Sequence, residues 1–448
     1  MTATARRGRG FGADVALLAG ARLATVVAFF GVSVVGARLL SPEALGSAAV
    51  GQTIGMIAAL VANGGLNIAT IYFLQQRPDE RATLVPRLGA LAIGGSTVAV
   101  VLVGISAPVV VGRVVADDAW PLMLAAAAMG AAMIAFEFAG ALLLGLGRAG
   151  GFTIMELVRG IGSLAAVTIL LAGPWREDGG FVLGLGLGYA AAALLGLIGT
   201  RRGGLSLRPR YDAAFTAEAL AFGLKGQVGN IFQFLGVRLD LLLVPALLDL
   251  RAAGIYVIAV RMSDVVGQAA TAASSLVFPR VAGQVEAGST LLTERATRMI
   301  LIVVAASALV LGVAGETVLR IAFGSIYAAG TVALLVLLVA TLPLSLGRLV
   351  AADLKGRGRP DLVSWAALLT VVATVAADLA LIPLLGIEGA ALASVLAYTV
   401  SATALLIGYR SVTGGRLAAL VPRPADVREL VTMTLGLVTG RRPRDGAA

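Results

Sequence analysis

The chain contains no cysteine and no histidine among its 448 residues, and these absences remove several kinds of chemistry. Without cysteine there are no disulfides, no thiolate nucleophiles and no cysteine-based zinc sites. Without histidine there is no imidazole to serve as a general base, as a metal ligand or in a proton relay. Catalysis by a Ser-His-Asp triad or by a histidine-bound metal is therefore excluded.

Charged residues are also scarce. Asp, Glu, Lys and Arg make up 13% of the chain, against 58% hydrophobic residues, and mean hydropathy is +0.95. Apolar runs of about 20 residues, the length needed to cross a hydrocarbon core of about 30 Å, follow one another along nearly the whole chain. The composition therefore predicts an all-α polytopic membrane protein.

Span length, charge and turn residues together predict about twelve transmembrane helices. The predicted spans cover residues 12–38, 44–75, 88–111, 120–146, 152–173, 181–200, 216–248, 254–279, 298–315, 328–353, 362–384 and 387–408. The first apolar run continues to about residue 36, which is too long for the apolar region of a cleaved signal peptide. We therefore interpret it as the first span.

Basic residues are distributed unevenly between the two sides of the predicted membrane. With the amino terminus in the cytoplasm, 24 of the 35 Lys and Arg residues lie on the cytoplasmic side and five lie outside. Because cytoplasmic loops carry an excess of Lys and Arg, this asymmetry predicts a protein of the cell (cytoplasmic or inner) membrane with both termini cytoplasmic. The net charge of +10 then reflects orientation and contact with anionic lipid, so it does not require nucleic acid as a partner.

Three short motifs recur at nearly equal spacing and indicate an internal repeat. The pairs are LLSPEALG ending at Gly46 with LLDLRAAG ending at Gly254, GLGR ending at Arg148 with GRGR ending at Arg359, and LIGTR ending at Arg201 with LIGYR ending at Arg410. Their spacings of 208, 211 and 209 residues each cover six predicted spans. An even number of spans keeps both halves in the same orientation, so the repeat is predicted to be parallel.

The repeat predicts how the chain is divided. Residues 12–200 form an amino-terminal six-helix lobe and residues 216–408 form a carboxy-terminal six-helix lobe. Residues 1–11 are a cytoplasmic amino terminus, 201–215 a cytoplasmic linker and 409–448 a basic cytoplasmic tail. Within the tail, the spacing of Val427, Leu430, Val431 and Val438 predicts a short amphipathic helix at the membrane interface.

The predicted eighth span carries charges in the middle of an apolar run, YVIAVRMSDVVGQAATAASS. A charge at the centre of a membrane helix costs about 2.5 to 3.5 kcal/mol on insertion scales. The polar residues recur at steps of three and four, which places them on one helix face; they are Arg261, Asp264, Gln268, Thr271 and Ser275. This face is predicted to contact water, protein or a ligand rather than lipid.

Other predicted spans also carry polar side chains, which are predicted to face water, protein or a ligand rather than lipid. The candidate substrate-binding residues are Arg22, Gln52, Asn63, Asn67, Asn230, Gln233, Arg238, Asp240, Arg261, Asp264, Gln268 and Arg348. An alternative for Arg261 is a structural ion pair with Asp264, one turn away. Glu156 and Arg159, three residues apart, are interpreted as a local ion pair.

Two acids, Glu137 and Asp378, have no basic residue nearby in the sequence. Ionisable residues within membrane spans commonly pair with one another or mark ion pathways. We therefore predict that these acids either pair with the arginines across the bundle or form a site for cation coupling.

Four longer stretches carry a family resemblance. They read ARLLSPEALGSAAVG, FLGVRLDLLLVPALLDLRAAGIYVIAVRM, FGSIYAAGTVALLVLL and DLALIPLLGIEGAALASVLAY. In order and spacing they resemble the polysaccharide-transport branch of the multidrug/oligosaccharidyl-lipid/polysaccharide (MOP) exporter superfamily, the Wzx-type flippases, over nearly the whole chain up to about residue 410.

The resemblance implies two six-helix lobes around a central cleft that rocks between inward-open and outward-open states. It implies a non-enzymatic carrier, without cofactor, for undecaprenyl-diphosphate-linked sugars, with polysaccharide-assembly glycosyltransferases or a polymerase as candidate partners alongside membrane lipids. In that family, arginines of the first and eighth spans line the cleft, and Arg22 and Arg261 are the matching positions. The chain departs from the family in carrying Asp378 where Asn is frequent, and it lacks the two extra spans usual in lipid II flippases.

Two other classes of function remain open. A cation-coupled multidrug exporter has the same scaffold, but its cleft is expected to favour acids, whereas the deep charges here are mostly basic. A membrane glycan ligase or polymerase needs a sizeable loop domain or an acid and base clustered at one interface. The predicted outside loops are no longer than about ten residues, which disfavours this enzyme class.

Overall fold

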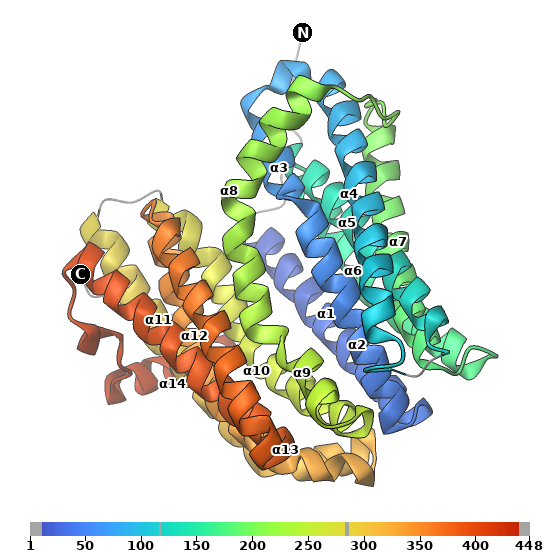
Figure 1. The fold of residues 1–448 in the computed structure, drawn as a ribbon. Helices are drawn as coiled ribbons and strands as arrows, with labels where there is room; N and C mark the ends of the chain where they lie inside the picture. Colours follow the sequence, from blue (N-terminus) through green and yellow to red (C-terminus); the bar gives the residue numbers. More distant parts are fainter. Residues whose placement is uncertain (1–10, 116–117, 283–285, 439–448) are drawn as a thin grey trace. The chain divides into compact units, whose positions relative to one another are not determined.

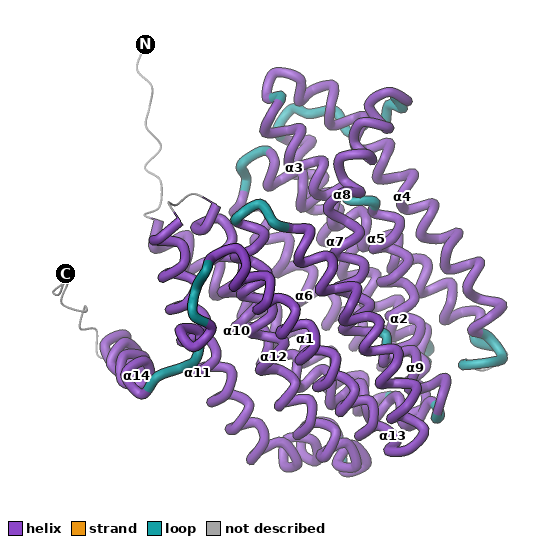
Figure 2. Tube along the Cα trace, turned by 60° about the vertical axis from the view of Figure 1, so that its left-hand side comes forward, coloured by secondary structure: helices purple, strands orange, loops and turns teal. Residues whose placement is uncertain are grey.

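The computed structural model describes residues 11–115, 118–282 and 286–438. These residues are helical nearly throughout, as Figures 1 and 2 show, apart from turns and an isolated bridge between Val111 and Val115. The helices are α1 (Phe11–Leu39), α2 (Pro42–Asn63), α3 (Leu66–Gln76), η1 (Pro78–Glu80), α4 (Arg81–Val110), α5 (Trp120–Gly145), α6 (Ala149–Ala172), α7 (Asp178–Arg202), α8 (Ala213–Arg238), α9 (Asp240–Leu247), α10 (Leu250–Ala282), α11 (Glu286–Val318), η2 (Leu319–Phe323), η3 (Ser325–Gly330), α12 (Thr331–Gly356), α13 (Pro360–Thr413), η4 (Leu417–Leu420) and α14 (Pro424–Val438).

Within the described ranges, eight helices are long and apolar enough to cross a membrane, and a ninth candidate arises if the bent pair α8 and α9 is one span. The all-α, polytopic class predicted from composition is therefore confirmed. One of the eight, α13, is 54 residues long and is broken at Gly386, whose φ of 62° and ψ of −138° are not helical. At 1.5 Å per residue an unbroken helix of that length would measure about 80 Å, well over twice the hydrocarbon thickness.

Two predicted spans, 12–38 and 254–279, are not in that set. Within α1, the side chains are described only from Ala24 onward, and the remaining helix to Leu39 is short. In α10, the charges of Arg251, Arg261 and Asp264 lower the apolar character of the helix. The count of twelve spans stays a prediction.

The chain divides into two compact units, which are described separately. Unit 1 comprises Met1–Ile231, Leu241–Ile258 and Ala322–Gly324, and unit 2 comprises Phe232–Asp240, Ala259–Ile321 and Ser325–Ala448. In unit 1, α7 packs against α5 and α6, α1 packs against α6, and α4 packs against α5. In unit 2, α12 packs along α13 and against α11. The boundaries of the two predicted lobes stay a prediction.

The first pair of repeated motifs meets in unit 1. Ser41 and Asp249 cap their helices in the same way: the Ser41 hydroxyl accepts from the Ala44 N–H at 3.1 Å and the Asp249 carboxylate from the Ala252 N–H at 2.7 Å. The two helix starts then pack on each other reciprocally. A Cβ atom at Gly46 would collide with the Leu250 carbonyl, and one at Gly254 would collide with the Pro42 carbonyl, so both positions require glycine.

The second pair of repeated motifs forms matching helix ends. At the end of α5, Gly147 has φ 73° and the next N–H, of Arg148, donates to the Leu143 carbonyl at 2.7 Å. At the end of α12, Gly358 has φ 75° and the Arg359 N–H donates to the Leu354 carbonyl at 2.9 Å. A left-handed glycine with this hydrogen bond is a standard helix terminator. The two halves of the repeat therefore fold alike at this point.

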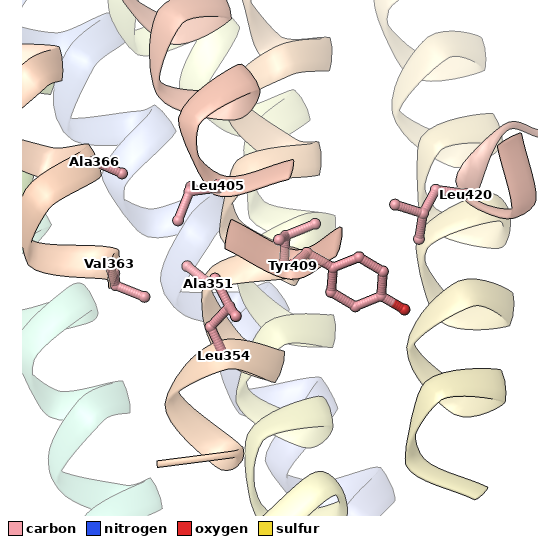
Figure 3. Packing of buried hydrophobic residues seen from close by; sticks show 8 residues of the cluster. Ala351, Leu354, Val363, Ala366, Leu405, Tyr409 and Leu420 are labelled. Carbon is pink, nitrogen blue, oxygen red and sulfur yellow. The ribbon is translucent and has the colours of Figure 1, made fainter. Parts of the chain in front are cut away.

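The carboxy-terminal part of unit 2 closes on an apolar cluster, drawn in Figure 3. Side chains of α12, both arms of α13 and η4 meet there; the buried members are Val350, Ala351, Leu354, Val363, Ala366, Leu405, Tyr409 and Leu420. Beyond η4 the chain continues into α14, so the helix predicted in the tail is confirmed. Asp426 at its start forms an ion pair with Arg298 of α11 at 3.0 Å.

Candidate functional site

A group of charged side chains in unit 2 surrounds Asp264 of α10. Its carboxylate lies 2.6 Å from the guanidinium of Arg238, at the end of α8. Both side chains are about three-quarters buried, with 25% and 29% exposed. Arg238 and Asp240 are two residues apart and cannot share a helix face, and Arg238 has Asp264 of α10 as its partner instead. We call Arg238, Asp240, Arg261, Asp264 and Arg348 the arginine cluster.

Arg348 reaches the arginine cluster from α12. It donates to the hydroxyl of Thr271 at 2.9 Å and to the carbonyl of Gly267 at 3.2 Å, both on α10. The contact depends on a small residue, because a Cβ atom at Gly267 would lie 3.2 Å from a guanidinium nitrogen of Arg348. The polar face of α10, predicted from its three-and-four spacing, therefore contacts protein side chains on α8 and α12.

Arg261 lies one turn before Asp264 on α10 and is half-buried. It is close enough to Arg238 and Asp264 for their charges to interact. In the described part of unit 2, the arginine cluster thus brings three guanidinium groups from three helices near two carboxylates. The excess of positive charge suits an anionic ligand, because guanidinium groups make bidentate, charge-assisted hydrogen bonds to phosphate.

A small cavity lies within the arginine cluster. Its volume is about 20 Å³, room for about one water molecule. Hydroxyl groups that the sequence analysis did not single out contribute to its walls, namely those of Ser263, Thr341 and Tyr398. No periodicity or charge marks these residues in the sequence, because Ser263 lies off the polar face of α10, and Thr341 and Tyr398 lie on helices whose own patterns are apolar.

Asp378 of α13 is fully buried in unit 2. Neither carboxylate oxygen has a hydrogen-bond partner among the described residues. Asp240, 3% exposed, is close enough for its charge to act on Asp378. An isolated ionised carboxylate is very unfavourable in an apolar interior, so this group is stable either protonated or beside a cation. The prediction that Asp378 pairs with an arginine finds no support in this geometry.

The candidate polar residues of unit 1 are separated. Asn67 of α3 donates to the Glu137 carboxylate of α5 at 3.3 Å, which joins one predicted sugar ligand to one predicted cation ligand. Gln52 lies beside Met56 on its own helix, α2. Asn63 ends α2 and is 6% exposed, with a side-chain oxygen that has no partner among the described residues.

Three further candidate substrate-binding residues differ in burial. Gln233 and Gln268 are exposed, and Asn230 is half-buried on α8. Arg22 lies on α1, and its side chain is outside the part of the structure that is described. Its predicted role opposite Arg261 therefore stays a prediction.

Arg159 of unit 1 has an ion-pair partner, a hydroxyl group and aromatic rings around its guanidinium. Glu156 lies 2.6 Å away on the same helix, so the predicted local ion pair is confirmed. The Tyr189 hydroxyl lies 3.4 Å from the guanidinium, and the rings of Phe29, Phe136 and Tyr189 surround it at 4.8 to 5.3 Å. We call this arrangement the Arg159 cage. Cation–π contacts of this kind stabilise a desolvated guanidinium.

Comparison with solved structures defines the class of fold. An inward-facing multidrug transporter of the MATE family in the MOP superfamily is similar with a TM-score of 0.69 and 15% identity, over 87% of this chain and 94% of that one. The lipid II flippase MurJ in an inward closed conformation is similar with a TM-score of 0.69 and 13% identity, over 96% and 94%. An outward-facing MATE transporter gives 0.60 at 15% identity, over 91% and 97%. The chain has the fold of these MOP-superfamily membrane proteins.

The family follows from the sequence match. A family model described as polysaccharide biosynthesis protein matches residues 35–331, more than half of the chain. The chain belongs to the polysaccharide biosynthesis protein family. The resemblance expected from the four quoted stretches is thereby confirmed. No curated protein matches the chain.

Proposed function

We propose that the protein is a flippase that carries a polyprenyl-diphosphate-linked oligosaccharide across the cell membrane by alternating access, for cell-surface polysaccharide synthesis. Both termini are cytoplasmic, and twelve spans form two parallel six-helix lobes, 12–200 and 216–408, around a central cleft. The family match and the fold shared with transporters support this proposal. The observation that carries it is the arginine cluster, with its three guanidinium groups on three helices within the apolar part of unit 2.

The chemistry of the arginine cluster suits a diphosphate. A diphosphate carries two or more negative charges, and it loses water when it enters an apolar protein. Arginine stays charged at any relevant pH and offers paired N–H donors that match phosphate oxygens. Arg261 binds the diphosphate, with Arg22 as a second ligand, and the amides of Gln52, Asn63, Asn67, Asn230, Gln233 and Gln268 are available for sugar hydroxyls.

Asp378 is proposed as the coupling group. A proton or a monovalent cation on its carboxylate removes the cost of burying the charge, and release of that ion restores it. Binding of the ion therefore favours one packing of α13 over another. Glu137, bound to Asn67, is the second candidate for this role.

Reconstitution tests the proposal directly. The full chain is placed in liposomes with an undecaprenyl-diphosphate disaccharide that carries a fluorescent group on its sugar, and membrane-impermeant dithionite is added outside. A flippase exposes the label of both leaflets, so quenching proceeds beyond the outer leaflet. Quenching that stops at the outer leaflet, as in empty liposomes, contradicts the proposal.

The alternatives give different results in the same liposomes. A cation-coupled multidrug exporter, the second candidate because of its shared fold, moves a cationic dye such as ethidium and leaves the labelled disaccharide in place. A glycan ligase or polymerase lengthens the oligosaccharide, which chromatography of the extracted lipid detects. The excess of arginine over acid in the arginine cluster disfavours a binding site for cationic drugs.

A further inference from the structure

A second pocket lies in unit 1 and shares no lining residue with the cavity in the arginine cluster. It occupies about 310 Å³, near the lower end of the range of small-ligand sites. It is bounded by the break between α2 and α3, by α4, by the first turns of α8 and by Tyr211 just before α8, elements that Figure 1 labels. Eleven of its fourteen lining residues are alanine, glycine, leucine or valine, and the other three are Asn63, Tyr211 and Thr216.

The break between α2 and α3 shapes the pocket. Gly64 and Gly65 have φ of 54° and 79°, values that suit glycine, and they separate α2 from α3. A Cβ atom at Gly65 would collide with the backbone of Gly223, so the break is held close to α8. On the opposite wall, a Cβ atom at Gly94 would meet nothing within 4 Å. The pocket therefore has free space at Gly94, whereas backbone atoms pack closely at the break between α2 and α3.

The pocket extends along α4. Ala90 to Val98 lie 9 to 17 residues beyond the start of α4, or about 14 to 26 Å along the helix. Tyr211 and Thr216 line the other end, next to the charged residues that precede α8. The same stretch of α4 carries exposed apolar side chains, with Ile93 56% and Val98 48% exposed. An apolar recess of this direction and depth suits a hydrocarbon chain.

The charged end of the pocket is held in place by specific contacts. The Arg210 N–H donates to the Pro86 carbonyl of α4 at 3.0 Å, and Asp212 forms an ion pair with Arg87 at 3.0 Å. Tyr211, which lies between these two anchored residues, is 75% exposed at the pocket rim. The position of the rim relative to α4 is therefore fixed within unit 1.

The segment that precedes α8 at this end carries an excess of positive charge. Residues 201–210 read RRGGLSLRPR and contain four arginines and no acid. Arg208 and Arg210 are exposed. The nearby acids already have basic partners, since Asp212 pairs with Arg87 and Glu218 pairs with Arg77 at 2.6 Å. Exposed arginines beside a membrane attract anionic headgroups.

From these observations we infer that the pocket binds one acyl chain of an anionic phospholipid, whose phosphate lies at Arg208 and Arg210. The acyl chain passes Tyr211 and Thr216 and ends against Gly94 and Val98. This site is distinct from the proposed diphosphate site, because none of its lining residues belongs to the arginine cluster. Asn63 is the one lining residue that is also among the amides proposed for sugar hydroxyls. Bound lipid would brace α4 against the start of α8 in unit 1.

The test fills the pocket at its open wall. Gly94→Leu places a side chain in the recess without a backbone collision, and Gly104→Leu is the matched control, because Gly104 also lies on α4, also has open space around it and does not line the pocket. The purified full-length protein is incubated with phosphatidylglycerol or phosphatidylcholine, and bound lipid is counted by native mass spectrometry. We expect Gly94→Leu to weaken phosphatidylglycerol binding about tenfold, as for the loss of about two buried methylenes, and Gly104→Leu to leave it unchanged.

The headgroup is tested separately. The pair Arg208→Gln with Arg210→Gln should reduce the preference for phosphatidylglycerol over phosphatidylcholine several-fold, whereas Arg410→Gln with Arg416→Gln, an equal loss of charge elsewhere, should not. A phosphatidylglycerol with a photoreactive acyl chain should label peptides that contain residues 90–98 or 216–220. If Gly94→Leu does not fold, Leu220→Trp fills the same pocket and gives the same readout.

Three results overturn the inference. The first is equal loss of binding in Gly94→Leu and Gly104→Leu. The second is equal retention of phosphatidylcholine and phosphatidylglycerol by the unaltered chain. The third is displacement of phosphatidylglycerol by undecaprenyl phosphate at equal concentration, which would assign the pocket to a prenyl chain instead.

Discussion

Two groups of buried charge, the Arg159 cage in unit 1 and the arginine cluster in unit 2, stabilise buried guanidinium groups in different ways. In the cage, one guanidinium has an acid three residues away and aromatic rings around it. In the arginine cluster, three guanidinium groups come from different helices, and the ion pair at Asp264 joins two of those helices. The comparison shows that a buried arginine does not by itself indicate a binding site. The excess of one charge, distributed over several helices, is the informative feature.

The largest effect is expected at Arg261. Arg261→Ala should reduce flipping of the labelled disaccharide on the order of a hundredfold or more, because two charge-assisted hydrogen bonds to phosphate are worth about 1.5 to 3 kcal/mol each. Expression and membrane insertion should be unchanged. Arg261→Lys should recover only part of the rate, since an ammonium group lacks the paired donors. The measurement is the dithionite assay in liposomes.

The double variant Arg261→Ala with Asp264→Asn shows whether Arg261 is a substrate ligand or one half of a structural ion pair. If Arg261→Ala prevents folding and the further change Asp264→Asn restores it, then Arg261 balances Asp264 and does not bind substrate. Normal transport by Arg261→Ala would equally refute the proposed role. Asp264→Asn alone should slow transport less than Arg261→Ala, because Asp264 holds Arg238 and does not contact an anionic ligand.

Substitutions in the Arg159 cage should change the stability of the protein rather than its transport activity. Arg159→Ala leaves Glu156 as an uncompensated buried charge, so the expected loss of stability is about 3 to 5 kcal/mol. The double variant Arg159→Met with Glu156→Gln removes both charges and should recover most of that stability. Thermal unfolding in detergent measures the first effect, and the liposome assay should show near-normal flipping by the double variant. Loss of transport in a stable double variant would make the cage part of the site.

Asp378 and Glu137 form a second comparison, between an acid without a hydrogen-bond partner in the described chain and an acid with one. Asp378→Asn should remove most of the dependence of transport on a proton or sodium gradient, with about a tenfold loss of gradient-driven rate. Glu137→Gln should change it by a few-fold at most, because an amide can still bond to Asn67. Equal gradient dependence in Asp378→Asn and the unaltered chain would exclude Asp378 as the coupling group.

Much of the fold was predictable from the sequence because the bilayer imposes length and composition on each span. Every predicted span falls on helix, and the repeat predicted from Gly46 and Gly254 appears as a reciprocal contact between two helix starts. Sequence spacing also identified the polar face of α10 and the Glu156–Arg159 pair, since both depend on contacts within one helix or on one face.

The rest depends on contacts between helices distant in sequence. The pairing of Arg238 with Asp264 joins α8 to α10 across 26 residues, and no local pattern links them. Tyr398 and Thr341 enter the cavity from α13 and α12 as ordinary members of apolar helices. The lipid pocket likewise arises from the break at Gly64 and Gly65 and an open wall at Gly94, which sequence spacing does not place together.

The smallest effect is expected where an ion pair lies outside the membrane spans, at the start of α14. Asp426 accepts from the Arg423 N–H at 2.8 Å and from Arg298 at 3.0 Å. The Arg423 backbone N–H, followed by Arg298, holds the pKa of Asp426 below its ordinary value. A depressed folded-state pKa gives stability above the unfolded-state pKa, about 3.9, and that stability is lost as the pH falls through the folded-state pKa.

Acid should therefore loosen the attachment of α14 to α11 while the membrane helices stay folded. The protection factors of residues 424–438 in the full-length protein, which compare measured amide exchange with the intrinsic rate at the same pH, should fall a few-fold between about pH 5 and pH 3, because protonated Asp426 loses its ion pair. Asp426→Asn should show the lower protection factors already at pH 7, with little further change in acid. Glu429→Gln is the matched control, since its pair with Arg295 is exposed and worth little. A pH dependence that persists in Asp426→Asn would place the acid-sensitive contact elsewhere on α14.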